Sequence, residues 1–457
     1  MVEEARARLT LGAKLGYTVA DVGFNLFWGV TSLFLLYYYT DVLGLPNATA
    51  GFIIMAALVW DGFIDPAVGI VANRTRTHWG RYRPYILWAA LPLCLSFVAM
   101  FVPFAATGAT LIAVTAATHL LFRTTYALTN IPYIALSAEF TSDSDERGAI
   151  AGFRMVFATI TTLIVAGTTL PLATALGGGD MRAGFVYVAA VYAAAAAVTF
   201  AISVLSTRET NAAGHDVATF AQIWRTLKAN RPFQLIFVAT ILSGIGGAMS
   251  GKMLIYFFKY NLAAPDKVTL GLTVLTGGVM LCVPVWAYIS KRTSKRLVWM
   301  LSGTIGAVAW ATLYLIPAPT VPITLGVLVF AAVGASGFYL SFWSMLPDTV
   351  EYGEWRTGER TEGVVFGLVL FAQKVALGIG IGLLGVLLDV IGYHANEVQS
   401  AATLAGIKTL LSLVPAMLGL AATATILFYP LDQRLHGRLV RALVRRRAGR
   451  QRTSAGA

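Results

Sequence analysis

Two aspartates lie within a stretch of sequence that is otherwise apolar. Asp61 and Asp65 both fall in "LVWDGFIDPAVG", and the residues that flank this segment are mostly aliphatic or aromatic. Their spacing of four places both carboxylates on one face of a helix, about one turn apart. Like charges at that distance repel each other, so a proton or a nearby cation must balance them. The pair therefore predicts a binding site for a coupling cation, H⁺ or Na⁺.

Arg123 brings a positive charge into another apolar stretch. Arg123 and Asn130 share one face of the predicted helix at 3.6 residues per turn. An uncompensated guanidinium at membrane depth is costly, so Arg123 needs an anionic partner. The aspartate pair and an anionic substrate both qualify, and we favour the substrate. Permanent neutralisation of the aspartates by Arg123 or by Lys374, which lies deep within its own apolar stretch, is the alternative.

The elements that must position these charges are membrane-spanning helices. Of the 457 residues, 57% are hydrophobic and 12% are charged, and the mean hydropathy is +0.71. This composition is too apolar for a soluble globular protein. Stretches long enough to cross the bilayer as helices occur twelve times: 16–40, 48–72, 82–104, 109–137, 150–175, 183–205, 232–260, 268–290, 297–316, 322–347, 364–391 and 405–429.

The basic residues indicate how the helices are oriented. Most of the 34 Lys and Arg residues fall in alternate loops together with both termini, whereas the opposite loops hold only Arg182 and Lys267. Loops rich in Lys and Arg stay in the cytoplasm. We therefore predict a multi-pass protein of the plasma (cell inner) membrane with both termini cytoplasmic. The net charge of +12 then follows from topology, and membrane lipid rather than nucleic acid is the expected partner of the basic tail.

The predicted helices form two equivalent groups of six. The longest polar interval separates them, and "DPAVGIVANRT" in the first group aligns without gaps on "VPVWAYISKRT" in the second. Such a repeat around a midplane site is typical of a major facilitator transporter. We therefore predict an all-α polytopic major facilitator fold. Its parts are an N-terminal half at 1–205 that holds the cation site, a cytoplasmic linker at 206–231, a C-terminal half at 232–430 and a basic cytoplasmic tail at 431–457.

Several long motifs resemble one transporter family, the glycoside-pentoside-hexuronide:cation symporters. They are "LLYYYTDVLGL", "WDGFIDPAVG", "TRTHWGRYRPYIL", "NIPYIAL", "FWSMLPDTVEYGEWRTGER" and "AQKVALG", and together they cover almost all of the chain. The resemblance implies that Asp61 and Asp65 bind the cation. It also implies that further residues line the sugar pocket or its ion-pair network: Asn25, Asn130, Arg154, Trp343 and Lys374.

The chain departs from the melibiose permease pattern of that family at several positions. Ile64 and Ala127 stand where neutral ligands complete a cation shell. Because Na⁺ prefers several oxygen ligands, these two departures favour H⁺ and leave Na⁺ open. A galactoside clamp is also missing, so another glycoside is the expected cargo. The replacements that remove the clamp are Phe24, Asn25, Asn130 and Ile134.

The expected function is secondary active transport: cation-coupled symport of a glycoside, pentoside or hexuronide by alternating access. A carrier of a lysophospholipid-like amphiphile is one alternative, because Phe24 and Ile134 would suit an acyl chain; an uncoupled uniporter is another. We expect no enzyme activity, since the sequence holds no metal cluster, phosphate loop or nucleophile triad. No cofactor, no metal beyond Na⁺ at Asp61 and Asp65 and no obligatory protein partner are expected. The small-molecule partner is expected to be a sugar or sugar acid.

Two charged loops are predicted to form an inner gate between the halves. "NRTRTHWGRYRP" is basic, and "DTVEYGEWRTGER" contributes the acids Asp348 and Glu351. Alternating access requires bonds between the halves that break and reform. We therefore expect these loops to pair on the cytoplasmic side.

Overall fold

The protein divides into two compact units. The computed structural model describes residues 9–140, 144–207, 209, 224, 228–358, 361–431, 435–443 and 445. Unit 1 comprises Met1–His215 and Ile381–Val398, and unit 2 comprises Asp216–Gly380 and Gln399–Ala457. The predicted linker lies mostly outside the described residues. The division differs from the predicted halves in one segment, Ile381–Val398, which packs with the first unit.

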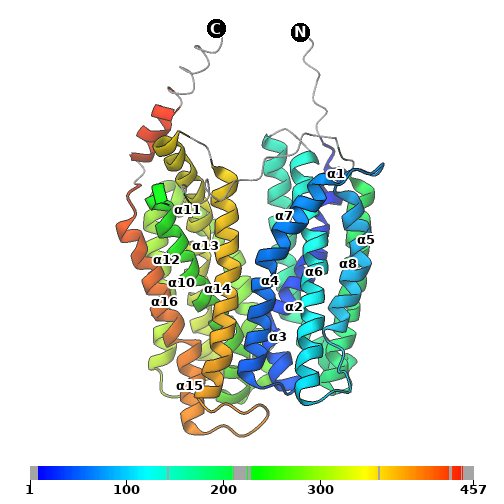
Figure 1. Ribbon diagram of the computed structural model, residues 1–457. Helices are drawn as coiled ribbons and strands as arrows, with labels where there is room; N and C mark the ends of the chain where they lie inside the picture. The colour runs from blue at the N-terminus through cyan, green and yellow to red at the C-terminus, as the bar shows by residue number, and fades with distance from the viewer. Residues whose placement is uncertain are drawn as a thin grey trace. The chain divides into compact units, whose positions relative to one another are not determined.

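Unit 1 is a bundle of helices that run side by side (Figure 1). Polar caps fix two of its helix starts, because Thr10 accepts a hydrogen bond from the N–H of Ala13 and Asp180 accepts one from the N–H of Arg182. The elements are α1 (Leu11–Thr18), α2 (Ala20–Leu33), α3 (Leu35–Tyr37), the π-helical turn η1 (Tyr38–Val42), α4 (Asn47–Arg74), α5 (Arg83–Ala99), α6 (Gly108–Phe140), α7 (Ser144–Leu176) and α8 (Met181–Ser206).

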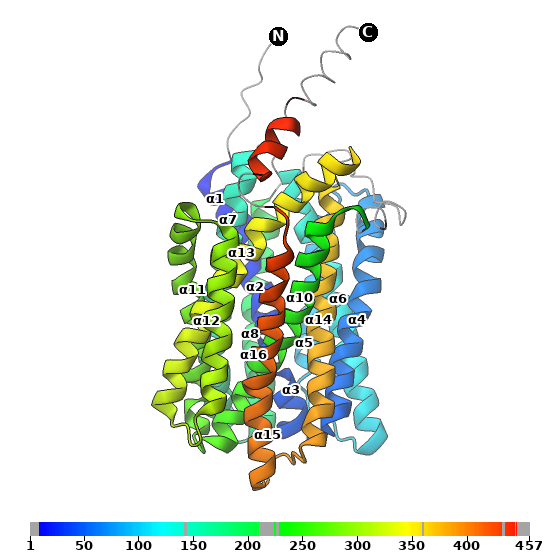
Figure 2. The same ribbon diagram turned by 90° about the vertical axis from the view of Figure 1, so that its left-hand side faces the viewer.

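Unit 2 is a second helical bundle, in which α12 packs against α13 and α16 (Figure 2). Its core includes the buried Trp299, Phe342 and Leu346. The elements are α10 (Arg231–Tyr256), the π-helical turn η2 (Phe257–Asn261), η3 (Pro265–Lys267), α11 (Val268–Arg292), α12 (Lys295–Leu315), α13 (Val321–Thr357), α14 (Glu362–Val390), α15 (Ala401–Leu411), α16 (Leu413–Ala424) and η4 (Thr425–Phe428); α14 passes into unit 1 after Gly380.

Each of the twelve predicted stretches coincides with a helix or a set of consecutive helices. Ten spans among the described residues are long and apolar enough to cross a membrane, and the pair Leu11–Leu33 and Leu35–Val42, bent by 55°, gives an eleventh if it is one span. The remaining stretch is α5, which is only 17 residues long. It ends at Ala99, earlier than predicted, and Pro103 follows shortly after, as is common beyond a helix end because proline cannot continue a helix. The predicted all-α polytopic membrane fold is confirmed.

The two units share details of local structure. Their first helices end in π-helical turns, η1 and η2, and each turn is followed by a residue with positive φ, Gly44 at 80° and Ala263 at 49°. Their second helices, α4 and α11, end at Arg74 and Arg292. These are the positions that the sequence alignment of the two halves makes equivalent. The internal repeat is therefore visible in the backbone.

The segment Ile381–Val398 is tied to η1 and to the start of α4 in unit 1. The hydroxyl of Tyr393 donates to both carboxylate oxygens of the buried Asp41, at 2.9 and 3.0 Å. The carboxylate of Asp389 accepts from the side-chain amide of Asn47 at 2.8 Å and from the N–H of Ala48 at 3.1 Å. Asp389 thereby satisfies a free N–H group at the start of α4.

Candidate functional site

Asp61 and Arg123 form a buried ion pair between α4 and α6. The Nη1 of Arg123 lies 3.3 Å from Oδ2 of Asp61, and each side chain is only 4% exposed. The guanidinium also lies over the ring of Trp28, 5.5 Å from its centroid. The two helices pack against each other along this face. Of the two partners left open by the sequence, the structure shows the aspartate, Asp61.

Two further polar side chains lie beside this ion pair. His119 is fully buried one helical turn before Arg123, and its ring lies 6.0 Å from that of Tyr39. Among the described residues, neither ring nitrogen of His119, nor the hydroxyl of Tyr39, nor Nε of Arg123 has a hydrogen-bond partner. The sequence analysis missed both His119 and Tyr39. The spacing of four between His119 and Arg123 was the available signal, since it places them on one helix face.

Asp65 lies one turn beyond Asp61 on α4 and is half-buried. Neutral oxygen ligands are scarce here, because the nearby predicted cation-shell positions hold Ile64 and the buried Ala127. Within the part of the chain that the structure describes, no group of three or more His, Cys, Asp or Glu side chains could hold a metal ion.

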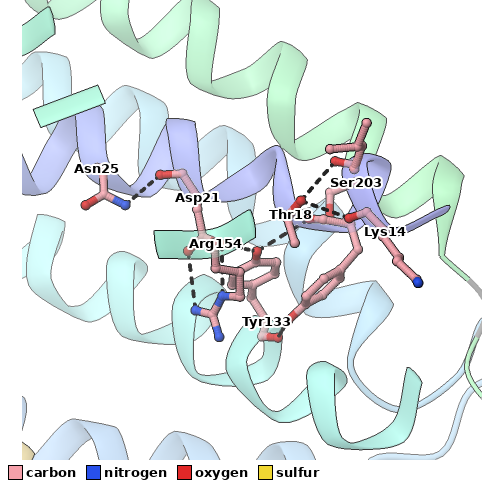
Figure 3. Close-up of polar contacts among 9 residues, drawn as sticks. Lys14, Thr18, Asp21, Asn25, Tyr133, Arg154 and Ser203 are labelled. Atoms are coloured by element: carbon pink, nitrogen blue, oxygen red, sulfur yellow. Dashed lines mark hydrogen bonds and ion pairs between the residues drawn. The ribbon is translucent and has the colours of Figure 1, made fainter. Parts of the chain in front are cut away.

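A second ion pair joins α2 to α7 (Figure 3). Arg154 donates from Nε to Oδ2 of Asp21 at 2.9 Å and from Nη2 to Oδ1 at 3.3 Å, so the contact is bidentate. The Asp21 side chain is 8% exposed, whereas that of Arg154 is 25% exposed. The guanidinium also lies over the ring of Tyr133, 5.0 Å from its centroid. Charge-assisted bidentate bonds of this kind are among the strongest in proteins.

Two stacked tyrosines hold Asp21 in place. The hydroxyl of Tyr133 donates to Oδ2 of Asp21 at 2.6 Å, and the hydroxyl of Tyr17 donates to the backbone carbonyl of Tyr133 at 2.7 Å. Their rings stack at 4.7 Å, and Ser203 on α8 donates to the carbonyl of Tyr17 at 3.0 Å. Four helices, α1, α2, α6 and α8, therefore fix the carboxylate that holds Arg154.

The sequence analysis did not identify Asp21. It weighed only the basic residues and the Asp61–Asp65 pair within the apolar stretches. A lone acid four residues before Asn25, on the same helix face, was the signal. In the structure the Asn25 side chain donates to the backbone carbonyl of Asp21 at 2.7 Å.

The other predicted site residues divide between the two units. Asn25 and Arg154 contact Asp21, and Asn130 is half-buried one turn before Tyr133 on α6, so these three residues belong to unit 1. Trp343 on α13 and Lys374 on α14 are half-buried residues of unit 2.

Phe24 is part of the packed core of unit 1. It is 2% exposed and lies between the rings of Tyr126 at 5.6 Å and Tyr133 at 5.1 Å. Its side chain therefore does not offer the free apolar surface expected for an acyl chain, although Ile134 is 43% exposed.

The acids of the predicted inner gate have partners within unit 2. Asp348 accepts from Nζ of Lys295 at 2.8 Å, and Glu351 lies 2.6 Å from Nε2 of His436. In unit 1, Glu209 accepts from the backbone N–H groups of Tyr82 and Arg83 at 2.7 Å. The acids Asp348 and Glu351 are thus paired within unit 2, and the basic loop of unit 1 is held by Glu209. These contacts were not predicted from the sequence.

The chain matches the family described as MFS/sugar transport protein over residues 16–433. It is 32% identical over 434 residues to the isoprimeverose transporter of Lactiplantibacillus pentosus, an alignment that covers 92% of this chain and 88% of that protein. It is also 28% identical over 422 residues to the glucuronide carrier protein homolog of Escherichia coli (strain K12), covering 92% of both chains.

Solved structures show the same fold at low sequence identity. The nucleoside transporter NupG superposes with a TM-score of 0.68 at 13% identity, covering 92% of this chain and all of the other. A bacterial homologue of the human drug peptide transporters PepT1 and PepT2 gives 0.67, also at 13% identity, and covers 94% of this chain and 99% of the other. The predicted major facilitator fold is confirmed.

Proposed function

Because the chain belongs to the MFS/sugar transport protein family, the glycoside-pentoside-hexuronide symporters of the major facilitator superfamily, we propose that it moves a sugar or glycoside in symport with a cation. Members of this family are membrane transporters, so the protein is a multi-pass transporter and not an enzyme. Alternating access would expose the sugar site to each side of the membrane in turn. The proposed orientation keeps both termini in the cytoplasm, as the distribution of Lys and Arg indicates.

The buried Asp61–Arg123 ion pair is the observation that carries cation coupling. A cation that binds Asp61 would compete with the guanidinium of Arg123 for the negative charge of the carboxylate and so would weaken their contact. A displaced guanidinium needs new acceptors, since a buried charge without hydrogen bonds is very costly. The hydroxyl oxygen of Tyr39 and a nitrogen of neutral His119 are acceptors that have no partner among the described residues. Binding of the coupling ion would therefore move Arg123 from Asp61 to this second position.

A proton fits this arrangement better than Na⁺. Protonation of Asp61 removes the charge that holds Arg123 and requires no ligand shell. A sodium ion would need several oxygen ligands, and Ile64 and Ala127 supply none. Asp65, half-buried one turn away, would complete the coupling site.

The cargo is proposed to be a sugar whose hydroxyl groups bind amide and guanidinium side chains. Asn25, Asn130 and Arg154 provide these groups in unit 1, and Trp343 and Lys374 are proposed to contribute from unit 2. The relatives include a transporter named for isoprimeverose and a carrier named for glucuronide. Both neutral and acidic sugars therefore remain in the proposed class. The burial of Phe24 weighs against an acyl-chain cargo.

A uniporter is the second candidate, and the same ion pair favours it. If Arg123 stays on Asp61 throughout the cycle, it serves as a fixed counter-charge and no ion is coupled. The two candidates differ in one measurable property, because only a symporter accumulates its cargo above equilibrium.

Transport by reconstituted proteoliposomes distinguishes them. Uptake of labelled pentosides, hexosides and uronides is measured with an imposed pH gradient, with a Na⁺ gradient and with neither. We expect accumulation with the pH gradient in the wild type, and Asp61→Asn should lose accumulation while it retains downhill counterflow. Asp266→Asn, at an acid in the short η3 turn, is the matched control and should behave as the wild type. Undiminished accumulation in Asp61→Asn would refute the coupling role, and wild-type uptake that never exceeds equilibrium would establish the uniporter.

A further inference from the structure

Of the two arginines that pair with Asp21 and Asp61, Arg154 is the one whose side chain can meet a cargo. Its side chain is 25% exposed, whereas that of Arg123 is 4% exposed. A guanidinium carries more N–H donors than the two that Asp21 takes. No side chain that the structure describes takes a hydrogen bond from the remaining donors of Arg154, so they can bind a sugar hydroxyl while the bidentate contact stays intact.

Asp21 cancels the charge of that exposed arginine. It is 8% exposed, and its carboxylate accepts from Arg154 and also from the hydroxyl of Tyr133 at 2.6 Å. Tyr133 is itself held by its stacking and hydrogen bond with Tyr17. The carboxylate is therefore fixed against Arg154 and is not a mobile surface group.

We propose that Asp21 selects the charge of the cargo: by holding Arg154, it admits neutral glycosides and excludes uronides. An incoming carboxylate would have to displace Asp21 from the guanidinium or lie close to its negative charge, and like charges in contact disfavour binding strongly. A neutral sugar needs neither change. This inference rests on the proposed sugar transport and names the substrate class within it.

The rest of the local surroundings agrees with a neutral cargo. Asn25 and Asn130, on the helices that carry Asp21 and Tyr133, are uncharged amides that donate and accept hydrogen bonds. The nearby cation Lys14 on α1 is paired with Glu146 on α7 at 2.7 Å. Arg123 is paired with Asp61. These described cations of unit 1 each have an acid of their own, so none is set aside for a substrate carboxylate.

The test compares two probes that differ only at C6, p-nitrophenyl glucoside with a neutral hydroxymethyl group and p-nitrophenyl glucuronide with a carboxylate, each as the α and the β anomer. Counterflow of each is measured in proteoliposomes that hold wild type, Asp21→Asn, Asp21→Glu, Arg154→Gln or the double variant Asp21→Asn/Arg154→Gln. The wild type should move the glucoside about tenfold or more faster than the glucuronide. Asp21→Asn should lower the ratio of glucoside to glucuronide transport to one or less, because it frees the guanidinium of Arg154 for the uronide.

The other variants separate charge from structure. Asp21→Glu keeps the charge and should keep the wild-type ratio, while the double variant removes both charges and should lose the gain of glucuronide transport. Melting temperatures of all variants check that they are folded. If Asp21→Asn does not fold, the ratio of glucoside to glucuronide transport in the wild type and in Asp21→Glu still tests the inference. Equal transport of both probes by the wild type, or an unchanged ratio in folded Asp21→Asn, would overturn the inference and leave the proposed function intact. If no sugar of either charge is moved, the proposed function itself fails.

Discussion

The Nη1 atom of Arg123 lies 3.3 Å from Oδ2 of Asp61, and neither side chain is more than 4% exposed. Breaking a buried ion pair by removing one partner costs about 3–5 kcal/mol, because the other charge is left unpaired. Removing both partners costs much less. The contributions of Arg123 and Asp61 to the free energy of unfolding should therefore be strongly coupled.

A double-mutant cycle tests that coupling. Arg123→Gln and Asp61→Asn should each lower the free energy of unfolding in detergent by about 3 kcal/mol or more, and the double variant should lose less than the sum of the two. Thermal or denaturant unfolding followed by circular dichroism measures the cycle. Additive effects would show that the two side chains do not depend on each other.

Replacement of His119 tests the proposed second position of Arg123. His119→Leu removes the acceptor nitrogen and leaves Arg123 only the hydroxyl of Tyr39 when a cation occupies Asp61, so proton-driven accumulation should fall strongly. His119→Gln retains a neutral acceptor and should keep much of the activity. Both variants should keep downhill counterflow, which does not require ion coupling. Wild-type accumulation by the leucine variant would contradict this role.

The contacts of Ile381–Val398 with unit 1 give a prediction about α4. Asp389→Ala removes the acceptor for the N–H of Ala48 and for the side chain of Asn47, and loss of a helix cap costs about 1 kcal/mol. Amide hydrogen exchange should therefore become faster in the first turn of α4. Leu383→Ala, at a 44% exposed position of α14, serves as the control and should leave that exchange unchanged. If the first turn of α4 exchanges as slowly in Asp389→Ala as in the wild type, other contacts hold the start of this helix.

The sequence predicted the helices well because membrane insertion depends mainly on long runs of apolar residues. It also predicted that Arg123 needs an anionic partner, since a buried charge at that depth cannot stay alone. It favoured the substrate and could not foresee the contact with Asp61, because that contact depends on how α4 and α6 rotate against each other. The 55° bend after Leu33 and the bonds of Tyr393 with Asp41 could not be predicted for a related reason. They depend on contacts between residues far apart in the chain, which have no local signal.

Asp21 shows a different limit of sequence analysis. Its bidentate contact with Arg154 joins residues that are 133 positions apart. Asp21 is a single acid in an apolar stretch, and such an acid needs a cationic partner as much as a buried base needs an anionic one. The sequence therefore shows that Asp21 needs a cation, but it does not show which of the basic residues in the apolar stretches is that cation.

In the helical segment at residues 435–443 of unit 2, called the tail here, the contribution of an ion pair to stability can be compared with that of apolar burial. His436 lies 2.6 Å from Oε2 of Glu351, but the two side chains are 26% and 30% exposed, and pairs so accessible to water contribute only about 0–1 kcal/mol. Leu439 and Leu443 on the same helix are 6% and 4% exposed in the core of unit 2, and Leu→Ala at buried positions costs about 2–5 kcal/mol. Apolar burial should therefore hold the tail.

Amide hydrogen exchange of residues 435–443 measures this directly. Leu443→Ala should release the tail and raise its exchange rate strongly, whereas Glu351→Gln should change it only slightly. Arg441→Ala, at an exposed position of the same helix, controls for loss of a side chain without loss of burial and should leave exchange near that of the wild type. A larger effect of Glu351→Gln than of Leu443→Ala would reverse the order and show that the charged contact holds the tail.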